Sequence, residues 1–115
     1  MPIIVFTKGG GNWLEALAQS GADCLGTDWT VNLTAARSRT KDLVSIQGNM
    51  DPAVLLAGDS AIEKEACRVL DDFGAVGKDG GHVFNLGHGV LQATQPEAIA
   101  TLVAVVHSYS KRYHH

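Results

Sequence analysis

The chain has 115 residues, enough for a single domain spanning residues 1–115 and too few for two ordinary domains. Nine Lys and Arg residues stand against twelve Asp and Glu residues, and the formal charge of −3 without any basic run argues against a nucleic-acid partner. The apolar runs fall short of the roughly 20 residues that a membrane helix needs, and the amino terminus lacks the basic-then-apolar order of a signal peptide, so no membrane association is expected.

Four short apolar runs, each followed by a turn and then by a helical pattern, predict alternating strands and helices. The first predicted strand is 3–6, and apolar residues at helical spacing over 13–18 follow its glycine-rich turn. The second strand is predicted near 22–26, and the turn 27–30 leads from it to a helix over about 33–37.

The middle of the chain contains the third predicted strand, 43–46, and two helices. Pro52 is expected to open a short helix, because a proline at the first helical position loses no hydrogen bond. The clearest helical pattern covers 61–73, where Ser60 and Glu63 have the spacing of a capping box. Its predicted buried face consists of Ile62, Ala66, Val69, Leu70 and Phe73.

The carboxyl-terminal part repeats the same rhythm. A glycine-rich loop over 74–81 leads to the fourth predicted strand, 83–86, and the last helix is predicted at 96–109 with Thr94 or Gln95 as its cap. The residues of this helix predicted to face inward are Ile99, Leu102, Val103 and Val106.

A right-handed parallel βα repeat places every turn that follows a strand at the carboxyl edge of the sheet. The turns KGGG, GTDW, GNMDP and NLGHG are therefore expected to face one concavity. The fold class that follows is α/β, and folds of this class place their sites at that edge.

The stretches IIVFTKGGGNWLEALA, GTDWT, SIQGNMDP and GHVFNLGHG occur in this order and span nearly the whole chain. Together they resemble the carboxyl-terminal part of the uroporphyrinogen decarboxylase family. The resemblance implies a parallel (βα)4 half of a TIM (β/α)8 barrel, corresponding to the last four βα units of the family's fold. A flatter, flavodoxin-like three-layer sheet is the alternative.

The resemblance also implies a reaction. Members of the family decarboxylate the four acetate side chains of uroporphyrinogen III, giving coproporphyrinogen III in haem biosynthesis without a metal or an organic cofactor. The pyrrole can accept the electrons left by carbon dioxide once a neighbouring ring carbon is protonated. The family's aspartate, arginine, tyrosine and serine or threonine residues at the substrate belong to the amino-terminal half, so no catalytic residue is assigned here. The isolated chain is expected to lack activity.

His88 is the candidate substrate-binding residue. It lies between Gly87 and Gly89 after an apolar strand, at the end where barrels place their sites, and an imidazole titrates near neutral pH. By the resemblance, it contacts a carboxylate or another polar edge of the tetrapyrrole substrate and assists proton transfer, and the two glycines leave room for the ligand. The alternative interpretation is a hydrogen-bonded histidine that only positions its loop.

Lys8 is a weaker candidate, because a cation at the end of the first strand can bind a substrate carboxylate or pair with Asp28 on the next turn. The glycines at 9–11 lack the spacing of a P-loop, so phosphate binding is not expected. A structural ion pair for Asp28 and a helix cap for Asp51 are favoured over acid and base roles.

Two tryptophans and two histidines are expected to have structural roles. Trp13 and Trp29 are predicted to pack under the rim of the sheet. His82 at a strand start and His107 on a helix are interpreted as structural rather than functional.

Cys24 and Cys67 are far apart and lie neither in a CxxC pair nor near a histidine at metal-ligand spacing. No zinc site and no disulfide are expected, and a reduced, cytoplasmic setting fits. A cobalamin- or coenzyme-M-linked methyltransferase of the same superfamily ranks low as a function. It would need a zinc-binding cysteine near the last strand, where NLGHGVLQ has none.

A noncatalytic half-barrel or interaction module is the main alternative function. Four strands of a closed barrel leave two unpaired edges and an apolar inner face, so self-association, as a homodimer, is expected. Barrel sequence of about 240 codons upstream of Met1 would identify the chain as a fragment. The sequence is compatible with a native or a tag-derived origin of His114-His115.

Overall fold

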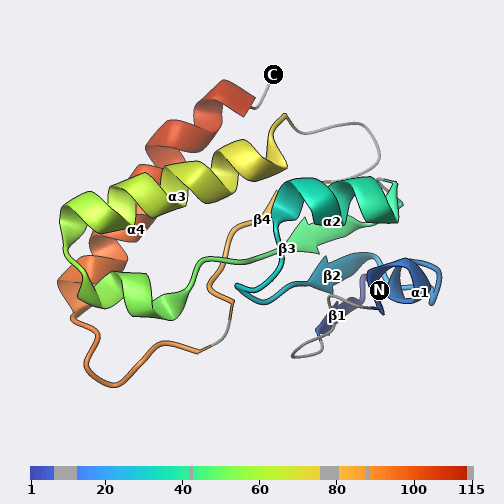
Figure 1. The fold of residues 1–115 in the computed structure, drawn as a ribbon, viewed down its shortest axis with the longest axis horizontal. Helices are drawn as coiled ribbons and strands as arrows, with labels where there is room; N and C mark the ends of the chain where they lie inside the picture. The colour runs from blue at the N-terminus through green and yellow to red at the C-terminus, as the bar shows by residue number, and fades with distance from the viewer. Residues whose placement is uncertain (7–12, 42, 76–80, 88, 114–115) are drawn as a thin grey trace.

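The computed structural model describes residues 1–6, 13–41, 43–75, 81–87 and 89–113 (Figure 1). Strands and helices alternate along the chain, as the sequence predicts. In chain order the elements are β1 (Ile4–Phe6), α1 (Leu14–Ala18), β2 (Cys24–Gly26), α2 (Leu33–Thr40), β3 (Ser45–Gln47), the 3-10 helix η2 (Pro52–Leu56), α3 (Asp59–Phe73), β4 (His82–Val83), α4 (Pro96–Tyr109) and the 3-10 helix η3 (Ser110–Tyr113).

The strands form one parallel sheet in the order β1-β2-β3-β4. In a sequential order every crossover moves in the same direction, and right-handed crossovers then place their helices on one face of the sheet. A flavodoxin-like sheet has the order 2-1-3-4-5 instead, with helices on both faces. The prediction of a (βα)4 half-barrel is confirmed, and the flatter three-layer alternative is wrong.

The two faces of the sheet differ in burial. Val5, Leu25 and Ile46 are neighbours across β1, β2 and β3 and pack into the hydrophobic core, where Leu25 is 0% and Ile46 1% exposed. Side chains alternate along a strand, so Ile4 and Phe6 point to the opposite face, where they are 53% and 48% exposed. The helices therefore cover one face and leave the other open, as on the inside of a barrel.

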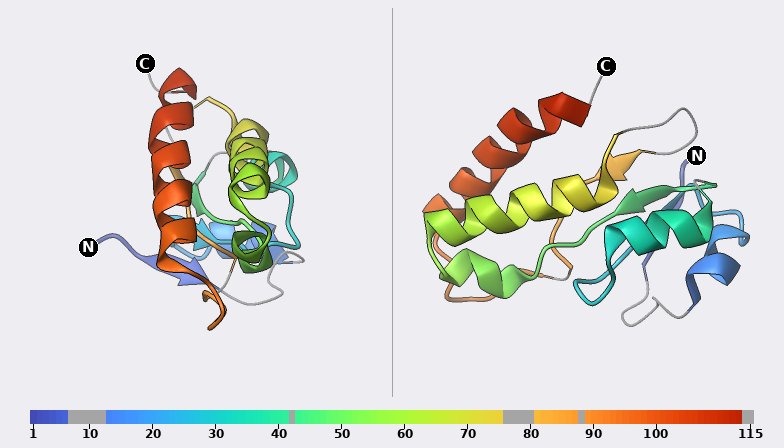
Figure 2. Two further views of the ribbon diagram at one scale, coloured as in Figure 1. Left: turned by 90° about the vertical axis from the view of Figure 1, so that its left-hand side faces the viewer. Right: turned by 45° about the horizontal axis from the view of Figure 1, so that its top comes forward.

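The helices pack against one another in chain order, α1 on α2, α2 on α3 and α3 on α4. Figures 1 and 2 show α3 and α4 side by side. The residues predicted for the buried face of α3 are all buried, namely Ile62, Ala66, Val69, Leu70 and Phe73. Within the described ranges, no helix combines the length and the apolar composition that crossing a bilayer requires.

Several predicted boundaries differ from the structure. The third strand begins two residues later than predicted, because the Leu43 N–H donates to the Thr40 carbonyl in the turn that ends α2. The fourth strand is His82–Val83 rather than 83–86, with a separate bridge between Leu86 and Met50. The last helix, Pro96–Tyr109, has the predicted bounds, and Gln95 is its N-cap residue without a side-chain hydrogen bond.

The capping box predicted for Ser60 and Glu63 is wrong. Helix α3 begins at Asp59, and the N-cap residue is Gly58, with φ +96° and no side-chain cap. The left-handed backbone conformation at Gly58 turns the chain from η2 into α3 two positions earlier than a cap at Ser60 would. Asp59 then places its negative charge in the first turn, where the helix dipole favours it.

The inward face of α4 differs from the prediction in part. Ala98 and Leu102 are buried, whereas Ile99 and Val103 are 39% and 47% exposed. The helix contacts α3 and η2, and beyond that contact it borders an apolar groove of about 310 Å³. The groove is lined by Leu55, Phe84, Asn85, Leu86, Val90, Ile99, Leu102, Val103, Val106 and His107.

His82 connects the helix layer with the edge of the sheet that carries the turns. Its ring stacks on Phe73 of α3 with 4.6 Å between centroids, and its Nε2–H donates to the Gly48 carbonyl at 2.8 Å. Burial lowers the pKa of His82; the hydrogen bond to Gly48 opposes this, and the Arg37 guanidinium adds to it. The structural role predicted for His82 is confirmed.

Stability is expected to fall as the pH drops below the unfolded-state pKa of His82, 6.5. The folded-state pKa is lower, so the unfolded chain binds more protons in this window and acid favours unfolding. Urea midpoints at about pH 7.5 and about pH 5.5 measure the drop. The His82→Gln variant should show a smaller drop and the exposed control His107→Gln an unchanged one. An equal drop in His82→Gln would contradict this role.

Candidate functional site

A hollow of about 610 Å³ lies at the carboxyl ends of β1 and β3 and beside the segment after β4. Its lining residues are Phe6, Gln47, Asn85, Leu86, Gly87, Gly89 and Val90. The hollow opens on the uncovered face of the sheet, which is the face that surrounds the centre in a closed barrel. Of the turns predicted to face one concavity, the turn after β4 lines this hollow within the described residues, whereas β3 contributes its last residue, Gln47, and not the turn that follows it.

The floor of the hollow is apolar. Phe6 and Gly26 are neighbours in register, and a Cβ atom on Gly26 would lie 2.9 Å from Cδ2 of Phe6. The Phe6 side chain therefore lies across the glycine, on the open face of the sheet. Gln47 and Asn85 are the two polar residues of the lining. The Asn85 Oδ1 atom is buried and has no hydrogen-bond partner within the described parts of the chain.

The turn after β2 is fixed by hydrogen bonds to the end of β3 and within the turn itself. The Thr27 backbone N–H and hydroxyl both donate to the Gln47 carbonyl, at 2.7 and 3.1 Å. The Asp28 side chain, in a residue only 6% exposed, accepts from the Thr30 N–H at 3.0 Å and also from the Thr30 hydroxyl. Asp28 thereby closes its own turn. The ion pair predicted with Lys8 stays a prediction, because Lys8 lies outside the described residues.

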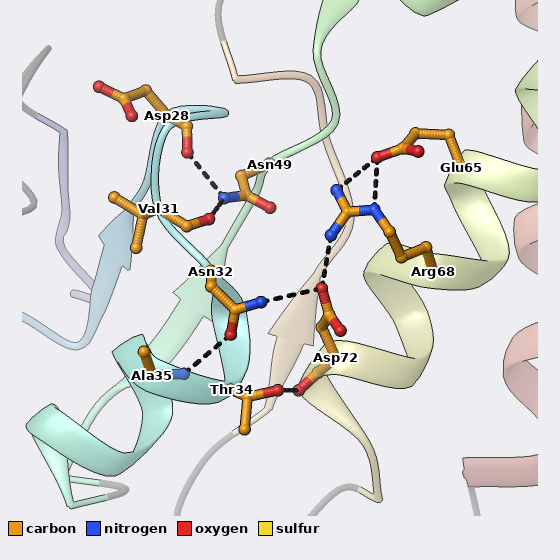
Figure 3. A network of polar contacts seen from close by, with 9 residues as sticks. All are labelled: Asp28, Val31, Asn32, Thr34, Ala35, Asn49, Glu65, Arg68 and Asp72. Carbon is orange, nitrogen blue, oxygen red and sulfur yellow. Dashed lines mark hydrogen bonds and ion pairs between the residues drawn. The ribbon is translucent and has the colours of Figure 1, made fainter.

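The turn after β3 is bonded to the turn after β2. Asn49 is 4% exposed, and its Nδ2 group donates to the Asp28 carbonyl at 2.7 Å and to the Val31 carbonyl (Figure 3). Asp51 follows as the N-cap of η2 and accepts from the Ala53 N–H at 2.9 Å. The helix-capping role predicted for Asp51 is confirmed.

The start of α2 is tied to α3 beside this turn (Figure 3). Asn32 caps α2 by accepting from the Ala35 N–H at 3.1 Å, and its amide donates to the Asp72 carboxylate at 3.3 Å. Arg68 donates to the same carboxylate at 2.6 Å, and the Thr34 hydroxyl donates to the Asp72 carbonyl at 2.5 Å. The first turn of α2 is therefore anchored to α3.

The segment after β4 packs between the other two turns. The Gly87 N–H donates to the Met50 carbonyl at 2.8 Å. On the other side a Cβ atom on Gly87 would lie 2.4 Å from the Trp29 backbone nitrogen. Nothing lies within 4 Å of the corresponding position on Gly89. Gly87 therefore permits close contact between two turns, and Gly89 leaves free space beside the hollow.

The structure describes some of the predicted site residues and not others. Gly87 and Gly89 both line the hollow, whereas His88, Lys8 and the rest of the KGGG turn lie outside the described residues. Gln47 and Asn85 were not predicted. For Gln47, its place as the last residue of β3 was a usable signal, because side-chain alternation turns it to the face opposite Ile46.

The packing role predicted for the two tryptophans is wrong, because Trp13 is 65% and Trp29 47% exposed. Trp13 precedes α1 as its N-cap residue, and Trp29 contributes its backbone to the contact with Gly87. Both residues lie in the connections between elements. Side chains there do not follow the periodicity that turns residues of a helix or strand toward the core. No group of three or more potential metal-ligating side chains gathers in the described ranges.

The two glycines of the β4 turn provide a matched test of the packing. Gly87→Ala is expected to destabilise the fold by about 1–3 kcal/mol, because the added methyl group overlaps the Trp29 backbone. Gly89→Ala meets open space and should change the free energy of unfolding by less than about 0.5 kcal/mol. Urea unfolding of both variants measures the difference, and equal stabilities would speak against the close contact.

Comparison with known proteins places this arrangement in a family. The family model for uroporphyrinogen decarboxylase (URO-D) matches residues 1–109. A uroporphyrinogen decarboxylase of Bordetella petrii is 61% identical over 114 residues, which are 99% of this chain and 32% of that protein. One of Ralstonia pickettii is 58% identical over 111 residues, 96% of this chain and 30% of that protein. The chain spans about a third of the length of these curated relatives.

Among solved structures, a methyltransferase from Methanosarcina mazei superposes with a TM-score of 0.75, covering 94% of this chain and 31% of that chain. At 20% identity the likeness shows the fold alone. The family match extends from β1 to the end of α4 and includes every turn around the hollow. The chain belongs to the uroporphyrinogen decarboxylase family.

Proposed function

We propose that this chain forms one wall of the substrate site of a uroporphyrinogen decarboxylase. The reaction converts uroporphyrinogen III to coproporphyrinogen III by removing carbon dioxide from four acetate side chains. The observation that supports the proposal most is the family match over residues 1–109, which includes the hollow at the carboxyl ends of the strands.

The hollow suits one edge of a tetrapyrrole. Phe6 offers an apolar surface to a pyrrole ring, and Gln47 and Asn85 are the polar residues that border it. In the proposed reaction, a proton adds to the ring carbon beside the acetate-bearing carbon. The bond to the carboxylate then breaks, carbon dioxide leaves, and its electron pair neutralises the cationic ring. A second proton completes the methyl group as the ring carbon loses the first, so each acetate takes up one proton overall.

His88 is proposed as the substrate-binding residue of this wall. It stands between two residues that line the hollow, Gly87 and Gly89, and the open space beside Gly89 leaves room for a bulky ligand. An imidazole there binds a substrate carboxylate or transfers a proton near neutral pH. Lys8, which follows β1 by two residues, is proposed as a weaker carboxylate contact.

The chain by itself is proposed to be inactive. The aspartate and arginine residues that the family resemblance implies at the substrate are expected in the part of the longer relatives that this chain does not span. A hollow bounded on one side also leaves the substrate in water, where electrostatic stabilisation of a pyrrole cation is weak.

The role of His88 is testable in a chimaera in which this chain replaces the corresponding third of the Bordetella petrii relative. His88→Asn should lower kcat/KM for uroporphyrinogen by roughly ten- to a hundredfold, the value of one hydrogen bond to a charged group. The exposed helix residue His107 provides the control, and His107→Asn should stay within about twofold. Unchanged kinetics in His88→Asn would favour a histidine that only positions its loop.

A second proposed role, a noncatalytic half-barrel that pairs with a further copy of itself, is favoured by the open face. Ile4, Phe6 and Val83 are all about half exposed there, at 53%, 48% and 46%. Strands β1 and β4 end the sheet at its two sides, and no further strand of the described chain pairs with them. Unpaired edges beside an apolar face favour association.

Light scattering is expected to give a mass that rises with concentration toward twice that of one chain. Phe6→Asp places a charge on the open face and should shift the equilibrium toward the monomer. Leu43→Asp, at a residue 62% exposed at the turn after α2, is the control and should not. A monomer at high concentration would rule out the pairing.

A further inference from the structure

Asn49 occupies a buried position that requires a side chain with two hydrogen-bond donors. It directly follows Gly48 at the end of β3, is 4% exposed, and donates from one carboxamide nitrogen to the carbonyls of Asp28 and Val31. Figure 3 shows its side chain pointing into the turn after β2, with the Asp28 carboxylate directed away. Both protons of the Nδ2 group therefore have acceptors in the same turn.

Few other side chains could donate both hydrogen bonds from this position. An aspartate would turn carboxylate oxygens toward two carbonyl oxygens, and an apolar residue would leave buried carbonyls without this donor. The neighbouring backbone is just as constrained, because a Cβ atom on Gly48 would lie 2.4 Å from the Thr27 hydroxyl oxygen. The turns after β2 and β3 are thus packed together at Gly48 and hydrogen-bonded at Asn49.

The same two turns enclose the segment that borders the hollow. Trp29, between the two carbonyls bound by Asn49, contacts Gly87 through its backbone nitrogen. Met50, the residue after Asn49, accepts from the Gly87 N–H and pairs with Leu86. Gly87 is therefore held from both sides by backbone whose position depends on residue 49.

We propose that Asn49 is a positioning residue for the reaction. It fixes the turn after β2 against the turn after β3, and through Trp29 and Met50 it sets the place of Gly87 and of the wall that follows. Asn49 does not line the hollow, and its effect on substrate passes through these neighbours. The inference rests on the proposed function for its kinetic consequence, whereas the geometric part stands without it.

Amide hydrogen exchange on the 115-residue chain tests the geometric part. Asn49→Ala should speed exchange at the Gly87 amide by about tenfold or more, relative to the Ile46 amide in β3, which reports wider opening. Asn32→Ala is the matched control, since it removes an asparagine whose Oδ1 caps α2. It should speed exchange at Ala35 and leave the ratio of Gly87 to Ile46 within about twofold.

Kinetics in the Bordetella petrii chimaera test the functional part. Asn49→Ala should lower kcat by roughly ten- to a hundredfold, because small displacements of a site residue cost that much. KM should stay within about threefold, since the Phe6 floor is untouched. Asn32→Ala should keep kcat within about twofold. Asn49→Asp preserves the shape of the side chain and removes its hydrogen-bond donors, so it should show the same loss of kcat. It replaces the alanine variant in this test if that variant does not fold.

The outcomes separate the two claims. Faster exchange at Gly87 and a kcat loss confined to the Asn49 variants support the positioning role. An unchanged exchange ratio, an equal kcat loss in Asn32→Ala, or loss of the fold in both Asn49 variants overturns it. If the unsubstituted chimaera does not convert uroporphyrinogen, the proposed function fails, and the exchange ratio alone then decides whether Asn49 positions Gly87.

Discussion

The structure depends on the burial of one row of side chains that runs across the parallel sheet. Val5, Leu25, Ile46 and His82 are neighbours in register, and all four face the helix layer. The three apolar members pack in the hydrophobic core, whose burial as a whole is the main favourable term in folding. Since successive residues of a strand point to opposite sides, this row also determines which residues stand on the open face. The hollow is thus a consequence of how the core is packed.

The turns at the carboxyl edge form a second level of organisation. They are joined mainly through backbone atoms, with Asn49 and Thr27 as the side chains that connect them. Backbone contacts of this kind require residues without a Cβ atom, which accounts for Gly48 and Gly87. The site is therefore supported by glycines and amides around it, whereas its floor is apolar.

The sequence was sufficient for the features that local pattern determines. The bounds of α4 and the buried face of α3 followed from helical periodicity, and the order of strands and helices followed from the repeated turns. The exposure of Ile99 and Val103 could not be predicted, because periodicity shows which residues are apolar and not which of them a neighbouring element covers. For the site, the motif indicated Gly87 and Gly89. Asn49 and Asn85 escaped notice, since their roles arise from contacts between turns distant in sequence.

Gly26 influences the depth of the hollow although it has no side chain of its own. Phe6 lies against Gly26, where a Cβ atom would come within 2.9 Å of its ring. A side chain at this position would lift the aromatic ring and make the hollow shallower, with every lining residue unchanged. The depth of the hollow on this side is then controlled from the second strand, at a residue that does not itself line the hollow.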